Sequence, residues 1–146
     1  PMNKGEYYLT DAFQYMIDRG ARIQVIDVEG WYDAGKIETL LDTNRVMLEK
    51  GRARRPSPPG ANGSTVIDPV YVEEGVVLEN ARIGPNVSLG AGSVVRSSQL
   101  RDVIVGRKSR IVDSSLHDSL LGDEVIVEGV QGEVTLGDHS EVRRKG

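Results

Sequence analysis

The chain has 146 residues, of which 38% are hydrophobic and only 5% aromatic, and its formal net charge is −4. Charges of mixed sign argue against the basic face of a nucleic-acid-binding protein, and the lack of cysteine excludes disulfides and thiolate metal sites. We find neither an apolar run long enough to cross a bilayer nor a signal-peptide pattern. We therefore expect a cytoplasmic protein with no membrane or nucleic-acid partner.

The first fifty residues predict a helix, a strand and a second helix. Residues 9–20 carry an apolar helical face, with Thr10 as N-cap and Gly20 as the stop. Residues 21–28 (ARIQVIDV) predict a strand, and residues 36–50 predict a helix that Gly51 ends. A single strand cannot close a sheet, so we expect residues 1–50 to be the end of a larger domain.

A linker is predicted for residues 51–65. Its first fourteen residues, GRARRPSPPGANGS, are rich in proline, glycine and polar groups, so they cannot bury an apolar face. Three arginines in this stretch, Arg52, Arg54 and Arg55, are expected to be solvated. We therefore place a domain boundary here and a separate domain at residues 66–146.

From Val66 onward, aliphatic residues recur with a period of about six residues. Large aliphatic residues recur every five or six positions, at Val72, Leu78, Ile83, Leu89, Val95, Leu100, Val105, Ile111, Leu116, Leu121 and Val127. A small or aliphatic residue lies two positions before each, at Val70, Val76, Ala81, Val87, Ser93, Ser98, Val103, Ser109, Ser114, Ser119 and Val125. Residues two apart in an extended chain face the same side. Each six-residue repeat therefore predicts a short strand with two inward side chains, followed by a corner.

Three of these six-residue repeats make a longer repeat of sixteen or seventeen residues, which predicts a three-sided solenoid of parallel strands. Gly84, Gly90, Gly106 and Gly122 are expected where the chain bends tightly. The segment 128–132 interrupts the count, so we expect a loop there and a last partial coil. This pattern resembles the hexapeptide-repeat family, whose fold is the left-handed parallel β-helix.

A second resemblance lies in the first fifty residues. The motifs EYYLTDAFQ (6–14) and GWYDAGK (30–36), followed by ETLL (38–41) and TNR (43–45), are similar to the end of a sugar-1-phosphate nucleotidyltransferase domain. The group that matches best is glucose-1-phosphate thymidylyltransferase-like with a long C-terminal β-helix. The expected fold class is therefore mainly β: a left-handed parallel β-helix preceded by an α/β helix–strand–helix remnant of the catalytic domain.

The resemblance implies nucleotidyl transfer, in which a sugar-1-phosphate oxygen attacks the α-phosphorus of a nucleoside triphosphate and pyrophosphate leaves. The substrates would be a nucleotide and a sugar phosphate, with Mg²⁺ as cofactor in the intact enzyme. One Mg²⁺-binding carboxylate of the family maps onto Asp11. By residue type alone, an Asp in the first turn of a helix is explained by the helix dipole. Which nucleotide and which sugar are used is not encoded in this stretch.

The chain contains no Gly-rich phosphate loop followed by basic residues, so we expect no catalysis and no bound cofactor in it alone. Trp31 and Asp33 are the candidate substrate-binding residues. The simpler reading makes Trp31 a packing residue under the second helix, with Asp33 as its N-cap, and leaves Lys36 solvated.

Two alternatives remain. Many hexapeptide-repeat proteins are acetyl-CoA-dependent acyltransferases that use a histidine as general base. His117 points outward from a flat side and is the candidate here, while His139 lies on a turn near the C-terminus; each is also explained as a solvated residue. The other alternative is an assembly module, with self-association into a trimer or dimer as the chain's own behaviour.

Overall fold

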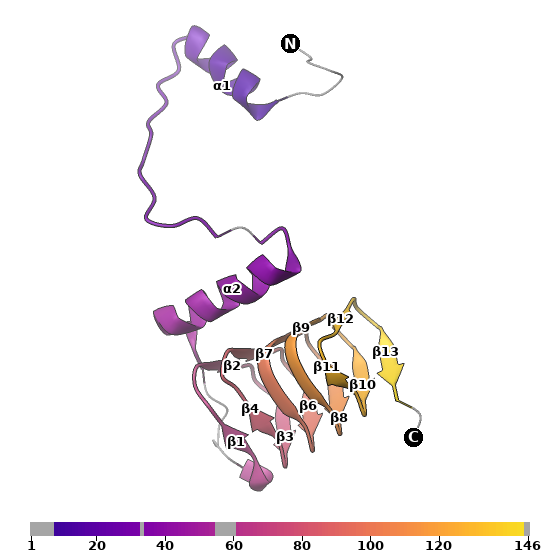
Figure 1. The fold of residues 1–146 in the computed structure, drawn as a ribbon. Coiled ribbons are helices and arrows are strands. Elements are labelled where there is room, and N and C mark those ends of the chain that lie inside the picture. The colour runs from indigo at the N-terminus through magenta and orange to yellow at the C-terminus, as the bar shows by residue number, and fades with distance from the viewer. Residues whose placement is uncertain (1–7, 33, 55–60, 145–146) are drawn as a thin grey trace. The chain divides into compact units, whose positions relative to one another are not determined.

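The computed structural model describes residues 8–32, 34–54 and 61–144. The chain divides into two compact units, Pro1–Trp31 and Tyr32–Gly146 (Figure 1). None of the described helices has the length and apolar character to cross a membrane. The predicted division into residues 1–50, 51–65 and 66–146 stays a prediction.

The first unit contains one described helix, α1 (Leu9–Asp18). Tyr8 is its N-cap and makes no side-chain cap, so the predicted capping role of Thr10 is wrong. Gly20 has a φ of +86° and its N–H bonds to Ile17 O, which ends the helix as predicted. No residue of α1 is buried, and its apolar residues Phe13 and Met16 remain about half exposed.

The predicted strand at residues 21–28 is absent. The segment has no regular secondary structure, and Val25 is 87% exposed. A strand needs a neighbour to satisfy its N–H and C=O groups. None of the described residues of this unit offers one, so alternating apolar residues alone do not produce a strand here.

The second unit begins with α2 (Ile37–Met47), which continues into a π-type turn, η1 (Leu48–Arg52). Lys36 is the N-cap; its backbone N–H donates to Thr39 Oγ1 (3.2 Å), and that hydroxyl donates to Lys36 O (2.9 Å). Gly51, at φ +88°, breaks the helical conformation where the sequence predicts the helix to end. The expected cap Asp33 lies outside the described residues.

After a 3-10 turn, η2 (Ala61–Gly63), the described part of the chain forms thirteen short strands, which make up the solenoid. The pairings between these strands are parallel. One sheet contains β1 (Thr65–Val66), β2 (Val70–Val72), β4 (Arg82–Ile83), β5 (Val87–Leu89), β7 (Gln99–Val105), β9 (Ser115–Leu121), β11 (Gln131–Gly132) and β12 (Thr135–Leu136). The other contains β3 (Val77–Glu79), β6 (Val94–Arg96), β8 (Arg110–Val112), β10 (Ile126–Glu128) and β13 (Glu141–Arg143).

The register confirms the predicted repeat. Val77 pairs with Val94, seventeen residues on, and Val94 pairs with Arg110, sixteen residues on. β7 and β9 each turn a corner, so two sides of the coil belong to the first sheet and the third side to the other. The mainly β class and the parallel β-helix of hexapeptide repeats are therefore confirmed.

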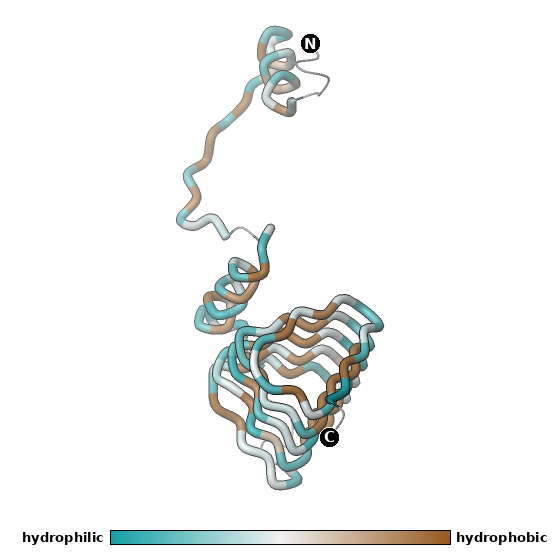
Figure 2. The backbone as a smooth tube through the Cα atoms, turned by 45° about the vertical axis from the view of Figure 1, so that its right-hand side comes forward, coloured by the Kyte–Doolittle hydropathy of each residue, from teal (hydrophilic) through white to brown (hydrophobic). Residues whose placement is uncertain are grey.

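Aliphatic columns fill the solenoid, as the sequence predicts. Every large inward position is buried, and among the smaller inward positions only Val76 is partly exposed. Figure 2 shows the apolar positions following one another from coil to coil. Transfer of each Val, Ile or Leu side chain from water contributes about 1.5–3 kcal/mol, so these columns supply most of the stability of the unit.

The inward serines have a role that the sequence analysis missed. Ser93 Oγ accepts a hydrogen bond from Ser109 N (3.1 Å), and Ser109 Oγ in turn accepts one from Val125 N (3.0 Å). Ser98 and Ser114 accept bonds from the next coil in the same way. A small hydroxyl thus fits the corner and also satisfies a buried amide of the neighbouring coil.

Residues with a left-handed backbone conformation lie at the corners of the coil, once in each six-residue repeat. Each of the three corners places a positive-φ residue in successive coils. The three columns are Asn80, Ser97, Asp113 and Gly129; Asn86, Asp102 and Asp118; and Gly75, Gly92, Lys108, Glu124 and His139. Asn and Asp tolerate this conformation better than other residues with a side chain, and Gly tolerates it best.

All four glycines predicted at bends lie at corners between strands, but only Gly84 has a left-handed backbone conformation, with a φ of +100°. Gly90, Gly106 and Gly122 are not in the left-handed region. They lie where neighbouring coils approach closely: a Cβ on Gly90 would be 2.7 Å from Gly106 C. These positions require glycine because of space and not because of φ.

The expected loop at residues 128–132 is also wrong. β11 pairs with β9 and β13 pairs with β10, so the chain completes another coil. The register shortens to fifteen residues between Leu120 and Thr135. The aliphatic count weakens because this is the last described coil, where Val134 and Leu136 are only partly buried.

Candidate functional site

Helix α2 packs along one side of the solenoid, against β7 and β9 (Figure 1). Leu41 is buried there, and Leu48 of η1 is buried next to β2. Of the other apolar residues in the predicted helix, Leu40 and Val46 are partly buried, and Ile37 and Met47 are exposed. The helix therefore contacts the solenoid through a narrow apolar stripe and a set of polar contacts.

The polar contacts are made with one corner column, Asn86, Asp102 and Asp118. These residues have φ values of 60°, 54° and 45° and follow one another in successive coils. Asn86 Nδ2 donates to Asp102 Oδ1 (2.9 Å). Because the corners repeat every sixteen residues, the column presents a row of acceptor oxygens toward α2.

Arg45 of α2 binds this column. Its Nε donates to Asp102 Oδ1 (2.8 Å) and its Nη2 donates to Asp118 Oδ1 (3.0 Å). Its Nη1 donates to Asp42 Oδ1 (2.9 Å), one turn away on the same helix. The hydrogen bond to Asp102 raises the pKa of Arg45, and the charges of all three aspartates act in the same direction against the effect of burial. The guanidinium therefore stays charged.

Asn44 makes a second connection. Its Nδ2 donates to Asn86 O (3.3 Å), and its Oδ1 accepts a hydrogen bond from Ser88 Oγ (2.6 Å). Asn44 and Arg45 thus fix both the position of α2 along the coils and its rotation about its own axis. We refer to Asn44, Arg45, Asn86, Asp102 and Asp118 as the α2 clamp.

A cavity of 520 Å³ lies between α2 and the later coils. Its lining residues are Ile37, Glu38, Leu41, Asp42, Arg45, Asp118, Glu133, Val134 and Thr135. Four of them carry carboxylates, and the one arginine of this lining is already paired with two of these. A lining of this charge disfavours the phosphates of a nucleotide.

His117 lies beside the clamp on β9. Its Nδ1 is 3.1 Å from Asp118 Oδ2 and 3.7 Å from Glu133 Oε1, and its side chain is 40% exposed. These three side chains are the one group of three or more potential metal ligands within the described residues. His117 also lines a second cavity of 240 Å³ with Arg82 and Arg101. A neighbouring carboxylate can orient an imidazole for proton transfer.

The other predicted site residues are dispersed. Asp11 lies in the first turn of α1, half-buried, and belongs to no group of three potential metal ligands among the described residues. Trp31 is 85% exposed within the first unit, and its packing under the second helix stays a prediction. Asp33 lies outside the described residues. His139 is exposed on a corner, with Nδ1 3.4 Å from Glu124 Oε2.

Sequence reasoning missed the α2 clamp. The signal available was the spacing of Asp102 and Asp118, sixteen residues apart at the same corner. That spacing predicts a row of carboxylates on one edge. It does not say which arginine binds them, because the partner lies 57 residues away from Asp102.

We expect Arg45→Gln to lower the free energy of unfolding by about 1–2 kcal/mol, because Asp102, only 13% exposed, loses its charged partner. Faster amide hydrogen exchange in α2, with the solenoid amides unchanged, is the expected readout. The matched control is Asp42→Asn, which removes a pair whose carboxylate is 68% exposed and which contributes under about 0.5 kcal/mol. Equal effects of the two variants would contradict the clamp.

Comparison with characterised proteins agrees with the two resemblances. The chain is 34% identical over 133 residues to a glucose-1-phosphate thymidylyltransferase of Streptomyces antibioticus, a match covering 90% of this chain and 37% of that protein. It is 29% identical over 163 residues to the protein of the same name from Streptomyces griseus, covering 96% and 46%. It is 32% identical over 153 residues to the bifunctional protein GlmU of Clostridioides difficile, covering 98% and 31%.

No family model matches the chain. The chain spans less than half the length of these relatives. Within that span, the matches extend over both the helical segment and the hexapeptide coils, because they cover nine-tenths or more of the chain. The chain is therefore homologous, over nine-tenths or more of its length, to proteins named glucose-1-phosphate thymidylyltransferase and GlmU, and it carries a hexapeptide-repeat β-helix of its own.

Proposed function

We propose that this chain is the β-helix-bearing part of a sugar-1-phosphate nucleotidyltransferase and that its own role is self-association. The supporting observation is the solenoid itself, a stack of parallel coils with straight, flat sides. Flat sides offer large surfaces for side-by-side packing. In the intact enzyme a nucleoside triphosphate and a sugar-1-phosphate would give a nucleoside-diphosphate sugar and pyrophosphate.

Catalysis by the chain alone is not expected. The sequence lacks a phosphate-binding loop, and the cavity beside α2 is lined by carboxylates. Tight binding of Mg²⁺ needs more than the single carboxylate of Asp11, which belongs to no cluster of three potential ligands among the described residues. The Mg²⁺ role of Asp11 and the substrate-binding roles of Trp31 and Asp33 stay predictions for the intact enzyme, as does its cytoplasmic location.

The test combines the chain with glucose-1-phosphate, Mg²⁺ and either dTTP or UTP. The expected result is no pyrophosphate above background, together with a mass larger than one chain in sedimentation. Pyrophosphate release above background would overturn the first half of the proposal, and a monomer at all micromolar concentrations would overturn the second.

An acyltransferase remains the second candidate because one contact favours it. The Nδ1 of His117 is held beside Asp118, which leaves Nε2 as the basic nitrogen. Titration with acetyl-CoA in a calorimeter separates the two functions. Binding that His117→Ala abolishes and His139→Ala preserves would favour the acyltransferase; absence of binding is the result that our proposal expects.

A further inference from the structure

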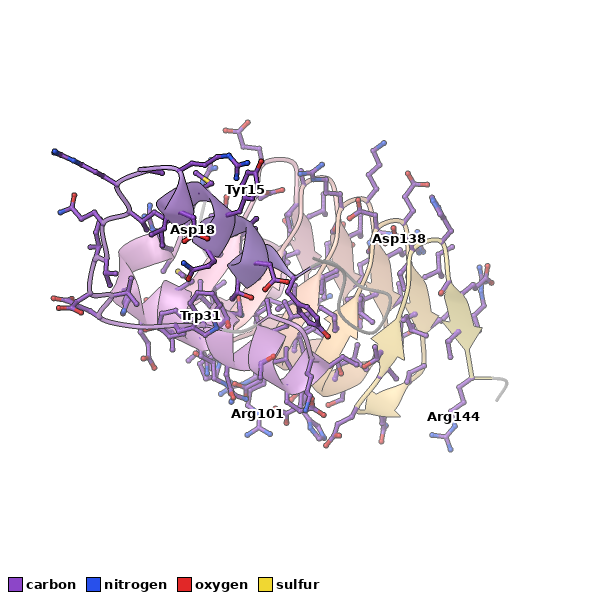
Figure 3. The ribbon with its side chains drawn as sticks, turned by 90° about the horizontal axis from the view of Figure 1, so that it is seen from above. Tyr15, Asp18, Trp31, Arg101, Asp138 and Arg144 are labelled. Atoms are coloured by element: carbon purple, nitrogen blue, oxygen red, sulfur yellow. The ribbon has the colours of Figure 1, made fainter. Side chains whose placement is uncertain are left out.

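The three sides of the solenoid differ in the side chains that point outward. On β2, β5, β7, β9 and β12 the central outward row includes Ile104 and Leu120, and α2 packs along this side. On β1, β4, β7, β9 and β11 the row is wholly polar: Thr65, Arg82, Gln99, Ser115 and Gln131. Arg101 also projects from this polar side into solvent (Figure 3).

The third side, formed by β3, β6, β8, β10 and β13, is here called the β8 face. It carries one exposed and three partly buried aliphatic side chains, without a covering helix among the described residues. One outward row is Val77, Val94, Arg110, Ile126 and Glu141. The second row is Glu79, Arg96, Val112, Glu128 and Arg143. Four β-branched residues on an open, flat sheet side are suited to contact with a protein surface.

The second row has an order of charges that is complementary to the same row reversed. Its charges run negative, positive, neutral, negative and positive from Glu79 to Arg143. Turning the row end over end brings Glu79 opposite Arg143 and Arg96 opposite Glu128, with Val112 opposite itself. We propose that the β8 face binds the β8 face of a second copy of this chain, antiparallel, about a two-fold axis at Val112.

This proposal rests on the self-association proposed above and specifies its surface and symmetry. Within one chain, Arg96 Nε is 2.6 Å from Glu79 Oε2, and Arg143 Nη1 is 3.4 Å from Glu128 Oε2. In the antiparallel pair each of these carboxylates gains a second arginine from the other copy. The side chains are 37–54% exposed, so their charged ends are available for such contacts.

Other arrangements of the same face are less favourable. Placing the row against itself in parallel register opposes Glu79 to Glu79 and Arg96 to Arg96, which costs Coulomb energy. A two-fold axis along the coils, midway between the rows, sets the second row against the first, so Arg96 faces Val94 and Glu128 faces Ile126. That arrangement pairs Arg143 with Glu141 but sets the charges of Glu79, Arg96, Arg110 and Glu128 against aliphatic side chains.

The first row adds an apolar contact and two unfavourable contacts, the first of which sets Val77 opposite Glu141. In the antiparallel pair Val94 lies opposite Ile126, while Arg110 lies opposite its own copy and must extend toward the edge of the face. The five coils of the face span about 24 Å by about 17 Å, or about 400 Å² on each copy and roughly 800 Å² in total. This area is below that of most specific interfaces, so we expect a reversible dimer with a dissociation constant in the micromolar range.

The experiment uses charge reversal in two separate variants, Arg96→Glu and Glu128→Arg. In an antiparallel homodimer each variant opposes like charges at two sites, so each is expected to dissociate at least about tenfold more readily than the parent chain.

Mixing the two variants in equal amounts is expected to restore the dimer. In a mixed pair the carboxylate introduced at position 96 meets the guanidinium introduced at position 128. The unchanged Glu128 of the first variant meets the unchanged Arg96 of the second, so both sites again pair opposite charges. We therefore expect sedimentation and native mass spectrometry to show a dimer that contains one copy of each variant.

The control is Arg82→Glu, an identical reversal on the polar side, which is expected to leave the mass unchanged. Circular dichroism of each variant shows whether the solenoid is folded before its mass is interpreted. Arg110→Gln, which removes the like-charge contact, is expected to tighten the dimer.

The outcomes separate this inference from the proposed function. A parent chain that is monomeric at all concentrations overturns both. A chain that self-associates, with both reversal variants keeping the parent mass, overturns the β8-face inference and leaves the proposed function standing. A trimeric mass, or failure of the mixed variants to associate, overturns the antiparallel arrangement.

Discussion

Replacing Gly90 by alanine is expected to lower the free energy of unfolding of the β-solenoid by at least about 3 kcal/mol. A Cβ at this position would lie 2.7 Å from Gly106 C and 2.8 Å from Arg107 N, and both atoms belong to the backbone of the next coil. Backbone atoms held by parallel pairing cannot rotate away as a side chain can. The two coils would have to separate locally, which breaks hydrogen bonds on both sides of the corner.

Gly137→Ala is the matched control, because Gly137 occupies the equivalent corner position in the last described coil. A Cβ there would meet nothing within 4 Å, and its φ is not in the left-handed region. We expect a change of no more than about 0.5 kcal/mol, measured by urea unfolding followed by circular dichroism. Similar losses for the two variants would show that close approach of the coils is not the reason for glycine at position 90.

Ser109→Ala is expected to cost about 2 kcal/mol, the second-largest single effect. The Ser109 hydroxyl accepts a hydrogen bond from Val125 N (3.0 Å) and donates one to Gly122 O (3.0 Å). Alanine fills nearly the same space, so the cost comes from leaving an amide of the fully buried Val125 without a partner. Thermal and urea unfolding measure the loss.

Ser115→Ala provides the comparison for this prediction. Ser115 points outward from β9 and is exposed. Water solvates its hydroxyl in the folded and in the unfolded chain, so removing the hydroxyl changes the free energy of unfolding little. We expect its unfolding midpoint to remain that of the parent chain. An unchanged midpoint for Ser109→Ala as well would mean that the inward serines act only through their small volume.

The solenoid is predictable from sequence because its determinants are local and repeated. Inward positions such as Ile83, Leu100 and Leu116 recur at a fixed spacing, and each coil contacts the coils next to it. The weaker pattern after Val127 leads to a wrong prediction of a loop, because the last described coil has no further described coil to bury its inward side. The weak apolar signal there accompanies continued parallel pairing through β11, β12 and β13 and not a change of structure.

The first unit and the α2 clamp are harder to predict for opposite reasons. Residues 21–28 have the alternation of a strand, but strand formation depends on a pairing partner that this segment does not contain. Arg45 is visible in the sequence, but its partners Asp102 and Asp118 are distant along the chain. Local pattern therefore identifies the repeating part and leaves the long-range polar contacts undetermined.

The sixteen-residue register between the central coils has a consequence for the evolution of this molecule. Residues 99 and 115 occupy the same place in successive coils, and each coil binds its neighbours through the same backbone hydrogen bonds. Tandem duplication of one sixteen-residue segment would add a complete coil and lengthen the stack by about 4.8 Å without disturbing the coils on either side. Deletion would shorten it by the same amount. The axial distance between any two attached parts can therefore change in equal steps, while the cross-section stays constant.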